Sequence, residues 1–223
     1  MRIVRGLTIL LLAGFMGSSA AWGGQIVLNS SDVIGASGSY YGSWNEPQFG
    51  AQNVLSQQTG SIHEDWGDYS YWINPDNGPA NAYIVIDLGA AYQVTSIVLF
   101  NTHNGWANDR GTGAFQIEAG NSVGATGAGY DITGALSTIL SGSLTADSNS
   151  NYYLTPQSFT VSAPGAYRYL RFEPLGQAVS SRPCCGANVY GLNEIRIFSD
   201  VPEPATWLTA VPLLALLWKR RAR

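Results

Sequence analysis

The stretch Tyr83–Thr112, with the sequence YIVIDLGAAYQVTSIVLFNTHNGWANDRGT, constrains the fold more than any other part of the chain. At its start Ile84, Ile86 and Leu88 alternate with residues that point the other way, which is the period of a half-buried β-strand. The segment Val94–Phe100 is apolar on both faces, as in a strand buried within a sandwich. A Gly-Ala-Ala sequence between the two predicts a turn. We therefore expect two neighbouring strands that present a polar, aromatic loop.

The rest of the chain favours the same fold class. Charged residues make up only 12% of the 223 residues, whereas Gly and Tyr are frequent, a composition typical of short strands and turns rather than long helices. The other strand-like segments are Gln25–Asn29, Ala114–Ala119, Ile132–Leu144, Tyr152–Val161, Tyr167–Phe172 and Leu192–Phe198. Gly50–Leu55 is expected to form a helical turn with Ala51, Val54 and Leu55 on one face, and Gly120–Gly129 a small-residue turn. We predict a single all-β domain over residues 25–199, a jelly-roll β-sandwich of about eight strands. The net charge of -4 argues against a nucleic-acid partner.

The N-terminus has the layout of an export signal. Arg2 and Arg5 supply positive charge, Leu7–Met16 is a short apolar run, and small residues follow as far as Ala21. The run is shorter than the ~20 residues that cross a bilayer. We therefore expect a signal peptide over residues 1–21 and an exported mature chain.

The C-terminus carries a second targeting layout. Pro202, Glu203 and Pro204 precede the apolar segment Ala205–Trp218 and a terminal basic cluster. The apolar segment predicts a short hydrophobic helix, suited to a transient contact with the inner membrane rather than to a permanent transmembrane helix. Residues 201–223 resemble the PEP-CTERM sorting signal of Gram-negative bacteria. This resemblance implies processing by an exosortase at the Pro-Glu-Pro motif and release to the cell surface or extracellular matrix, together with exopolysaccharide in a biofilm.

A second resemblance covers the domain itself. The phrases YIVIDLG, VTSIVLFNTHN, NDRGTGAFQIEAG, YRYLRFEP and GLNEIRIF occur here in the order found in discoidin domains. These are also called coagulation factor V/VIII C-type domains and belong to the galactose-binding-like jelly rolls. The resemblance covers residues 25–199. It implies a non-catalytic domain that binds sugars, lipid headgroups or protein partners through loops at one end of the sandwich.

The same resemblance implies a structural calcium ion, the one cofactor that we expect. In related domains the phrase GLNEIRIF often carries a Glu that helps to hold calcium, and here that residue is Glu194. Calcium requires six to eight oxygen ligands, many of them backbone carbonyls. A Glu that is satisfied by hydrogen bonds or by a nearby Arg accounts for Glu194 equally well. The chain also has Ser56–Gly60 where many sugar-binding members have an Asp-Gly calcium loop.

Aromatic and polar residues in the loops are the candidate ligand contacts. The set comprises Trp66, Tyr71, His103, Asn104, Trp106 and Arg110. Flat aromatic rings pack against the C–H face of a sugar, and the polar side chains hydrogen-bond its hydroxyls. The alternative is that Trp and Tyr belong to the core, and Trp72 is the residue most readily assigned to it. Asp109 and Arg110 match a turn phrase of the family, which favours a framework role for this pair.

An enzyme is the least favoured function. The densest acidic cluster, Glu64, Asp65 and Asp68, lies within one loop beside His63, and adjacent loop residues rarely place two carboxylates across a scissile bond. We therefore predict an exported, non-catalytic protein that binds carbohydrate or exopolysaccharide. The alternatives are a structural surface protein that binds protein partners and, third, a glycan-active enzyme.

Overall fold

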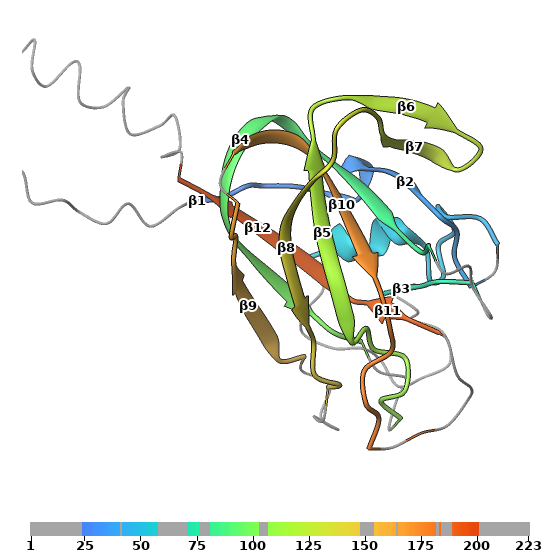
Figure 1. Ribbon diagram of the computed structural model, residues 1–223. Helices are drawn as coiled ribbons and strands as arrows, with labels where there is room; N and C mark the ends of the chain where they lie inside the picture. The colour runs from blue at the N-terminus through green and yellow to red at the C-terminus, as the bar shows by residue number, and fades with distance from the viewer. Residues whose placement is uncertain are drawn as a thin grey trace, which may run out of the picture.

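One long strand, β4 (Ile84–Phe100), belongs to both sheets of the fold (Figure 1). In the computed structural model its first part pairs with β2 (Val33–Ala36) and β10 (Ala166–Pro174). Its last part pairs with β12 (Glu194–Ser199) and β9 (Pro156–Thr160). The alternating first half and the apolar second half of this stretch are therefore one strand that passes from one layer to the other.

The structure describes residues 24–40, 42–57, 71–75, 81–102, 107–147, 154–163, 165–181, 183 and 189–200. The remaining elements are β1 (Gly24–Gln25), η1 (Ser30–Asp32), η2 (Ala51–Leu55), β3 (Trp72–Ile73), β5 (Ala114–Gly120), β6 (Val123–Thr126), β7 (Gly129–Ile132), β8 (Ser137–Ser143) and β11 (Gly191–Leu192). The expected signal peptide and sorting signal lie outside these residues. Within the described ranges, no helix has the length and hydropathy needed to cross a membrane.

The turn predicted between the two halves of β4 is wrong. The residues Gly89, Ala90 and Ala91 are exposed, and Gly89 has a φ of +79°, but the strand continues through them. A positive φ is a conformation that glycine adopts without steric cost. The glycine therefore lies at the irregularity between the pairings of Asp87 and Tyr92 with β10 and does not end the strand. The change of sheet follows between Gln93 and Val94.

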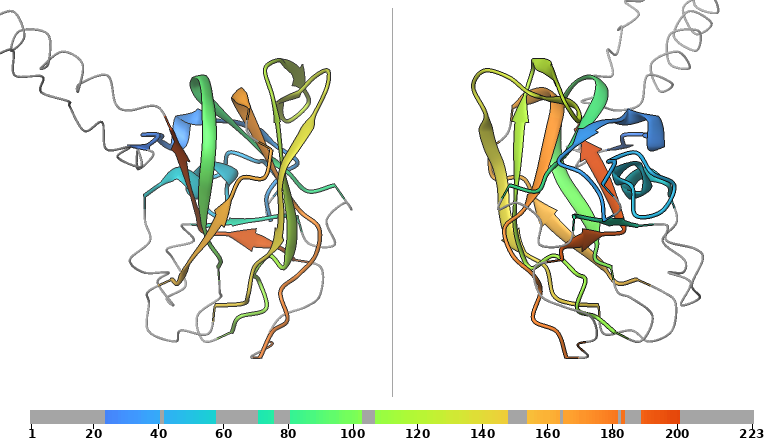
Figure 2. Two further views of the ribbon diagram at one scale, coloured as in Figure 1. Left: turned by 60° about the vertical axis from the view of Figure 1, so that its left-hand side comes forward. Right: turned by 90° about the vertical axis from the view of Figure 1, so that its right-hand side faces the viewer.

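Two sheets form the layers of the domain (Figure 2). The front sheet has the order β6-β7-β2-β4-β10-β5-β8, and the back sheet consists of β1, β12, β9 and the last part of β4. A separate pair, β3 and β11, lies beside them. This arrangement confirms the all-β prediction and is consistent with a β-sandwich.

The main core lies between the two sheets. Ile84 and Ile86 of the front sheet share one cluster of buried side chains with Ile97 of the back sheet. The helical turn η2 adds Val54 and Leu55 to the same cluster, which confirms the apolar face predicted for it. The alternation of β4 thus sends every second residue into one core, as its period requires.

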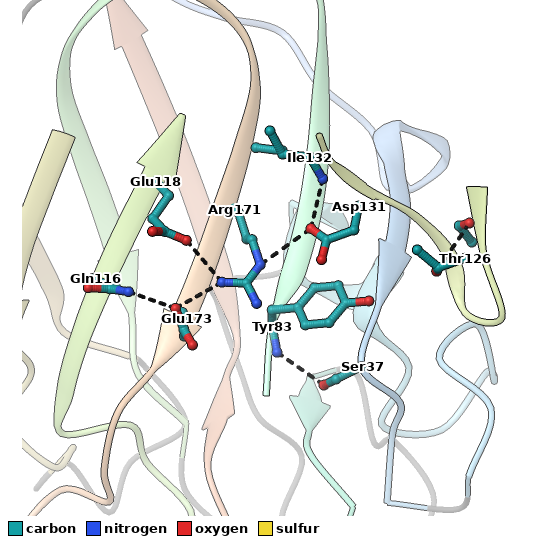
Figure 3. A network of polar contacts seen from close by, with 10 residues as sticks. Ser37, Tyr83, Gln116, Glu118, Thr126, Asp131, Ile132, Arg171 and Glu173 are labelled. Atoms are coloured by element: carbon teal, nitrogen blue, oxygen red, sulfur yellow. Dashed lines mark hydrogen bonds and ion pairs between the residues drawn. The ribbon is translucent and has the colours of Figure 1, made fainter. Parts of the chain in front are cut away.

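The outer face of the front sheet carries a network of ionised side chains under the β6–β7 hairpin (Figure 3). Arg171 of β10 contacts Glu118 of β5 at 3.0 Å and Glu173 at 2.8 Å, and its Nε lies 3.3 Å from Asp131 of β7. The guanidinium also lies over the ring of Tyr83, 4.5 Å from its centroid. One cation therefore joins three strands and holds the hairpin against the sheet.

Candidate functional site

Three loops meet at one end of the sandwich, the lower end in Figure 1, which we call the loop end. They follow β4, β8 and β10. Backbone hydrogen bonds join them, from Leu144 to the carbonyl of Gly113 at 2.9 Å and from Gly113 to Gly176 at 2.7 Å. A further bond joins Ala178 to Gly111 at 2.9 Å. These bonds fix the loops relative to the two sheets.

The three loops surround a cavity of about 370 Å³, here named the loop-end pocket. Its volume falls within the ~300–1000 Å³ of small-molecule sites. Apolar lining comes from Ala114, Leu144, Ala146, Ala178 and Val179, and polar lining from Asn108, Ser143, Thr145, Gln177 and Ser181, with Gly113 between them. Hydroxyl and amide groups beside apolar surface are the combination that an amphipathic small molecule such as a sugar can use.

Asn108 is a buried brace between the loops rather than a group that projects into the pocket. Only 1% of it is exposed. Its Nδ2 donates to the carbonyl of Asp147 and to the hydroxyl of Ser181, both at 3.1 Å. Its Oδ1 accepts from the hydroxyl of Ser180 at 2.8 Å and from the backbone N–H of Ser181 at 3.1 Å. One amide thus fixes the positions of all three walls.

Two further amides add to this bracing. Asn101, fully buried, donates from Nδ2 to the carbonyls of Thr112 at 2.9 Å and Thr145 at 2.8 Å. Gln177 donates from Nε2 to the carbonyl of Asp109. A side chain at Gly113 would bring its Cβ to 2.5 Å from the carbonyl oxygen of Gln177, so glycine is needed where these loops approach.

The Asp109–Arg110 pair lies at the same end. Asp109 is 4% exposed, and its carbonyl accepts the bond from Gln177, as expected for a residue that shapes the turn. Arg110 is half-buried, with its guanidinium 5.6 Å from the ring centroid of Tyr40. A ligand contact by Arg110 stays a prediction.

The position of Tyr71 does not suit the ligand contact that was predicted for it. Only 2% of it is exposed, and its ring packs edge-on against Phe49 at 5.1 Å between centroids. In this position the ring offers no open face to a sugar, because core side chains cover it. The neighbouring Trp72 is fully buried, and its Nε1 donates to the carbonyl of Gly38 at 2.9 Å, as the core assignment expects.

The other predicted contacts, Trp66, His103, Asn104 and Trp106, lie outside the described residues, as does the Pro202-Glu203-Pro204 motif. The wall formed by the loop after β10 was not predicted from the sequence. The residues of this loop that line the pocket are Gln177, Ala178, Val179 and Ser181, none of them aromatic, and the signal for them in the sequence was their position between two strands.

The candidate calcium ligand Glu194 is fully buried at the start of β12. Its Oε2 accepts from the backbone N–H of Gln57 at 3.1 Å, and Arg196 lies 3.9 Å from its Oε1. Burial raises the pKa of Glu194 to about 7, although the Gln57 N–H and the Arg196 charge both oppose the rise. The ionised carboxylate is therefore less stable in the folded protein than in water.

A cation beside Glu194 would stabilise the ionised form. Oε1 is buried and makes no hydrogen bond within the described part of the chain, and the ion pair that it forms with Arg196 is long, at 3.9 Å. The described residues hold no cluster of three or more His, Cys, Asp or Glu that could bind a metal, so backbone carbonyls would have to complete the set. Glu194 fits the implied calcium as one ligand, with the turn at Gln57, whose φ is +64°, beside it.

Comparison with known proteins agrees with this fold. The model of the F5/8 type C domain family matches residues 33–186. Among curated proteins, none matches the chain.

Solved structures share the fold at low sequence identity. The family 32 CBM of Clostridium perfringens NanJ in complex with galactose is 14% identical, with a TM-score of 0.51 over 78% of this chain and 98% of that chain. A CBM32 of C. perfringens in complex with GalNAc-β-1,3-galactose is 8% identical, with a TM-score of 0.54 over 79% and 100%. The F5/8 type C domain of a Bacteroides fragilis protein is 11% identical, with a TM-score of 0.52 over 80% and 97%.

Proposed function

Because the chain belongs to the F5/8 type C domain family, we propose that it is a non-catalytic carbohydrate-binding protein with a jelly-roll sandwich that binds a saccharide at the loop end. The observation that carries this proposal is the loop-end pocket, with hydroxyl groups beside apolar surface and walls braced by buried amides.

A glycan array tests this function directly. The mature protein, residues 22–200, should bind at least one class of saccharide on the array, or polysaccharide extracted from its host. Titration calorimetry should then yield a single-site isotherm that free sugar competes away. An array and an extracted polysaccharide that both stay at background would contradict the proposal.

The proposed location is the outer surface of a Gram-negative cell, or its exopolysaccharide matrix, after exosortase processing. The positions of the two described ends support it. Gly24 of β1 pairs with Ser199 of β12, and Ser199 pairs in turn with Val94 of β4. Phe100, the last residue of β4, leads into the loop end. Val94 and Phe100 are six residues apart along β4, about 20 Å. A domain held through these ends presents its pocket away from the point of attachment.

A second candidate, adhesion to a protein partner, is favoured by exposed apolar residues on the loop after β10. Leu175 is 53% exposed and Val179 94% exposed. Apolar side chains that are this exposed contribute to the free energy of binding when a partner buries them. Capture of a protein from an extracellular fraction that free sugar does not compete with would favour this candidate over the first.

Replacing Asn108 by alanine should weaken saccharide binding about tenfold or more. The substitution leaves the partners of its four hydrogen bonds unsatisfied between the loops, and one such buried group costs about 1–3 kcal/mol. The walls of the pocket are then free to move apart. Calorimetric titration measures the affinity, and a thermal melt of the variant checks that it is folded at the temperature of the titration.

The matched control is Asn121→Ala. Asn121 also joins two segments, through bonds to Ala166 and Arg168 at 3.0 and 2.9 Å, but at the opposite end of the sandwich. Its loss should leave affinity unchanged. Equal affinity losses in the two variants would mean that Asn108 acts through general stability and not through the pocket.

A further inference from the structure

The front sheet ends at β6 with an open strand edge (Figure 1). Among the described strands, β6 pairs with β7 alone. The edge strands β8 and β9 are joined to each other, because Ser162, which follows β9, donates its N–H and its hydroxyl to the carbonyl of Ile139 in β8, both at 2.9 Å. The remaining edge strand, β1, has only two residues. The described parts of the two sheets therefore leave β6 as their longest unpaired edge.

The register of the hairpin shows which backbone groups of β6 face outward. Ser122 accepts a hydrogen bond from the backbone N–H of Thr133 at 2.9 Å, just before the paired residues of the hairpin begin. Hydrogen-bonded and non-hydrogen-bonded pairs alternate along an antiparallel ladder, so Gly124 is again bonded to β7. Val123 and Ala125 are not, and their N–H and C=O groups point away from β7. Each of the two therefore offers a donor and an acceptor to a further strand.

The hairpin that carries this edge is fixed to the front sheet. Ala36 of β2 donates its backbone N–H to the carbonyl of Ala128 at 3.2 Å, in the turn between β6 and β7. Asp131 of β7 lies 3.3 Å from the Nε of Arg171 on β10. Val123 packs against a cluster of buried side chains on the outer face of the same sheet. The edge therefore needs no reordering before it pairs, which keeps the entropy cost of association low.

The chemistry of the edge suits a second copy of this chain. The segment 121–128 has no charged residue and no proline, which are two of the devices that protect edge strands from pairing. Two copies therefore meet here without like charges, although the chain as a whole has a net charge of -4. Asp131, the charged residue of β7, is directed toward Arg171. A highly charged peptide would find no counter-charge on this strand.

We propose that β6 pairs antiparallel with β6 of a second copy, about a two-fold axis that passes beside Gly124. Val123 of each copy then lies opposite Ala125 of the other, and each of these pairs exchanges two backbone hydrogen bonds. At the axis the two Gly124 residues form a non-bonded pair, where the strands come closest, to about 4.5 Å between Cα atoms. Glycine has no side chain to keep them apart. Every contact occurs twice, as in the two-fold dimers that are commonest among oligomers.

A short strand edge predicts a weak dimer. Four residues on each side cover less than the ~1,200 Å² that stable interfaces bury, so association should become visible only at high concentration. Sedimentation equilibrium of the mature protein, residues 22–200, should show an average mass that rises from monomer toward dimer between about 10 µM and about 1 mM. A mass that stays monomeric across this range overturns the proposal.

Ala125→Pro is the decisive variant, because proline removes an outward N–H and leaves the bonds between β6 and β7 intact. The dimer loses one hydrogen bond on each side of the axis, and its dissociation constant should rise about tenfold or more. Ala125→Ser keeps the N–H at the same exposed position and is the matched control, which should associate like the wild-type protein. Thermal melts check that both variants are folded. Equal association of Ala125→Pro and the wild-type protein overturns the proposal.

Amide hydrogen exchange followed by NMR locates the contact. The Val123 and Ala125 amides should exchange more slowly as the concentration rises, whereas the Gly124 amide, already bonded to β7, should not change. A dimer that leaves Val123 and Ala125 unprotected uses another surface and overturns the proposal. Protection that appears only after an extracellular fraction is added to a monomeric protein assigns the edge to a foreign strand and also overturns it.

Discussion

Replacing Arg171 by methionine is expected to lower the free energy of unfolding by about 3 kcal/mol, because three carboxylates then lose their shared counter-charge. In the network on the front sheet, Arg171 lies 2.8 to 3.3 Å from Glu118, Glu173 and Asp131. The four side chains are only 12–28% exposed, so water replaces little of the lost interaction. Denaturation in urea, followed by tryptophan fluorescence, measures the change.

Arg168→Met is the matched control on the same strand. Arg168 pairs with Asp87 at 2.8 Å, but its side chain is 44% exposed, so solvent and salt screen the pair. The control should therefore lose much less stability than Arg171→Met. Adding Glu118→Gln and Glu173→Gln to Arg171→Met should recover part of the loss, since these changes remove the unpaired charges. Equal losses in the two single variants would contradict a special role for the network.

The periodic spacing of apolar residues correctly predicted which faces of β4 and η2 are buried. The alternation from Ile84 to Leu88 assigned core residues correctly, because the side-chain period of a strand follows from its backbone geometry. The spacing of Ala51, Val54 and Leu55 predicted a buried face on a helical turn for the same reason.

The errors occurred where the sequence is rich in small residues. A Gly-Ala-Ala segment is typical of a turn, but here β10 pairs with Asp87 before the segment and with Tyr92 after it, which keeps the segment in β4. The region from Gly120 to Gly129 was expected to be a turn and contains the strand β6. Pairing with other strands decides the conformation of such segments, because their small side chains have little preference of their own for strand or turn.

The site was predictable in its location more than in its composition. Resemblance to discoidin domains indicated loops at one end, and the pocket lies at such an end. The bracing role of Asn108 depends on contacts with residues 39 and 73 positions away, which no local pattern encodes. Tyr71 shows the converse error, because an aromatic residue in a polar stretch indicated a contact and the fold buries it.

Glu194→Gln should be more stable than the wild-type protein at pH 8 in metal-free buffer, and nearly equal to it at pH 5. Folding raises the pKa of this carboxyl from 4.5 to about 7. Below pH 4.5 both folded and unfolded chains carry the proton, so the group contributes nothing. Between pH 4.5 and 7 only the folded chain keeps it, so wild-type stability falls as the pH rises. Above pH 7 the loss is complete and amounts to about 3 kcal/mol.

Urea denaturation at half-unit steps from pH 5 to pH 8 measures this slope. Asp87, whose pKa the hydrogen bond from Arg168 holds below its usual 3.8, stays ionised throughout that range and does not contribute. The variant should show a flatter profile than the wild-type protein, because glutamine keeps the acceptor for the Gln57 N–H and carries no charge. A slope that is equally steep in Glu194→Gln would assign the titration to another group.

Calcium separates a metal ligand from a carboxyl that is merely buried. A cation held by Glu194 favours the ionised form, so calcium chloride should raise the wild-type melting temperature at pH 8 and flatten the pH profile. At a calcium concentration of about 100 times Kd the gain in stability is about 2.7 kcal/mol. Glu194→Gln should show no such gain. A wild-type profile that calcium leaves unchanged, together with a flat profile in Glu194→Gln, would mean that Glu194 titrates in the core without a metal and that the chain departs from the calcium-binding members of its family.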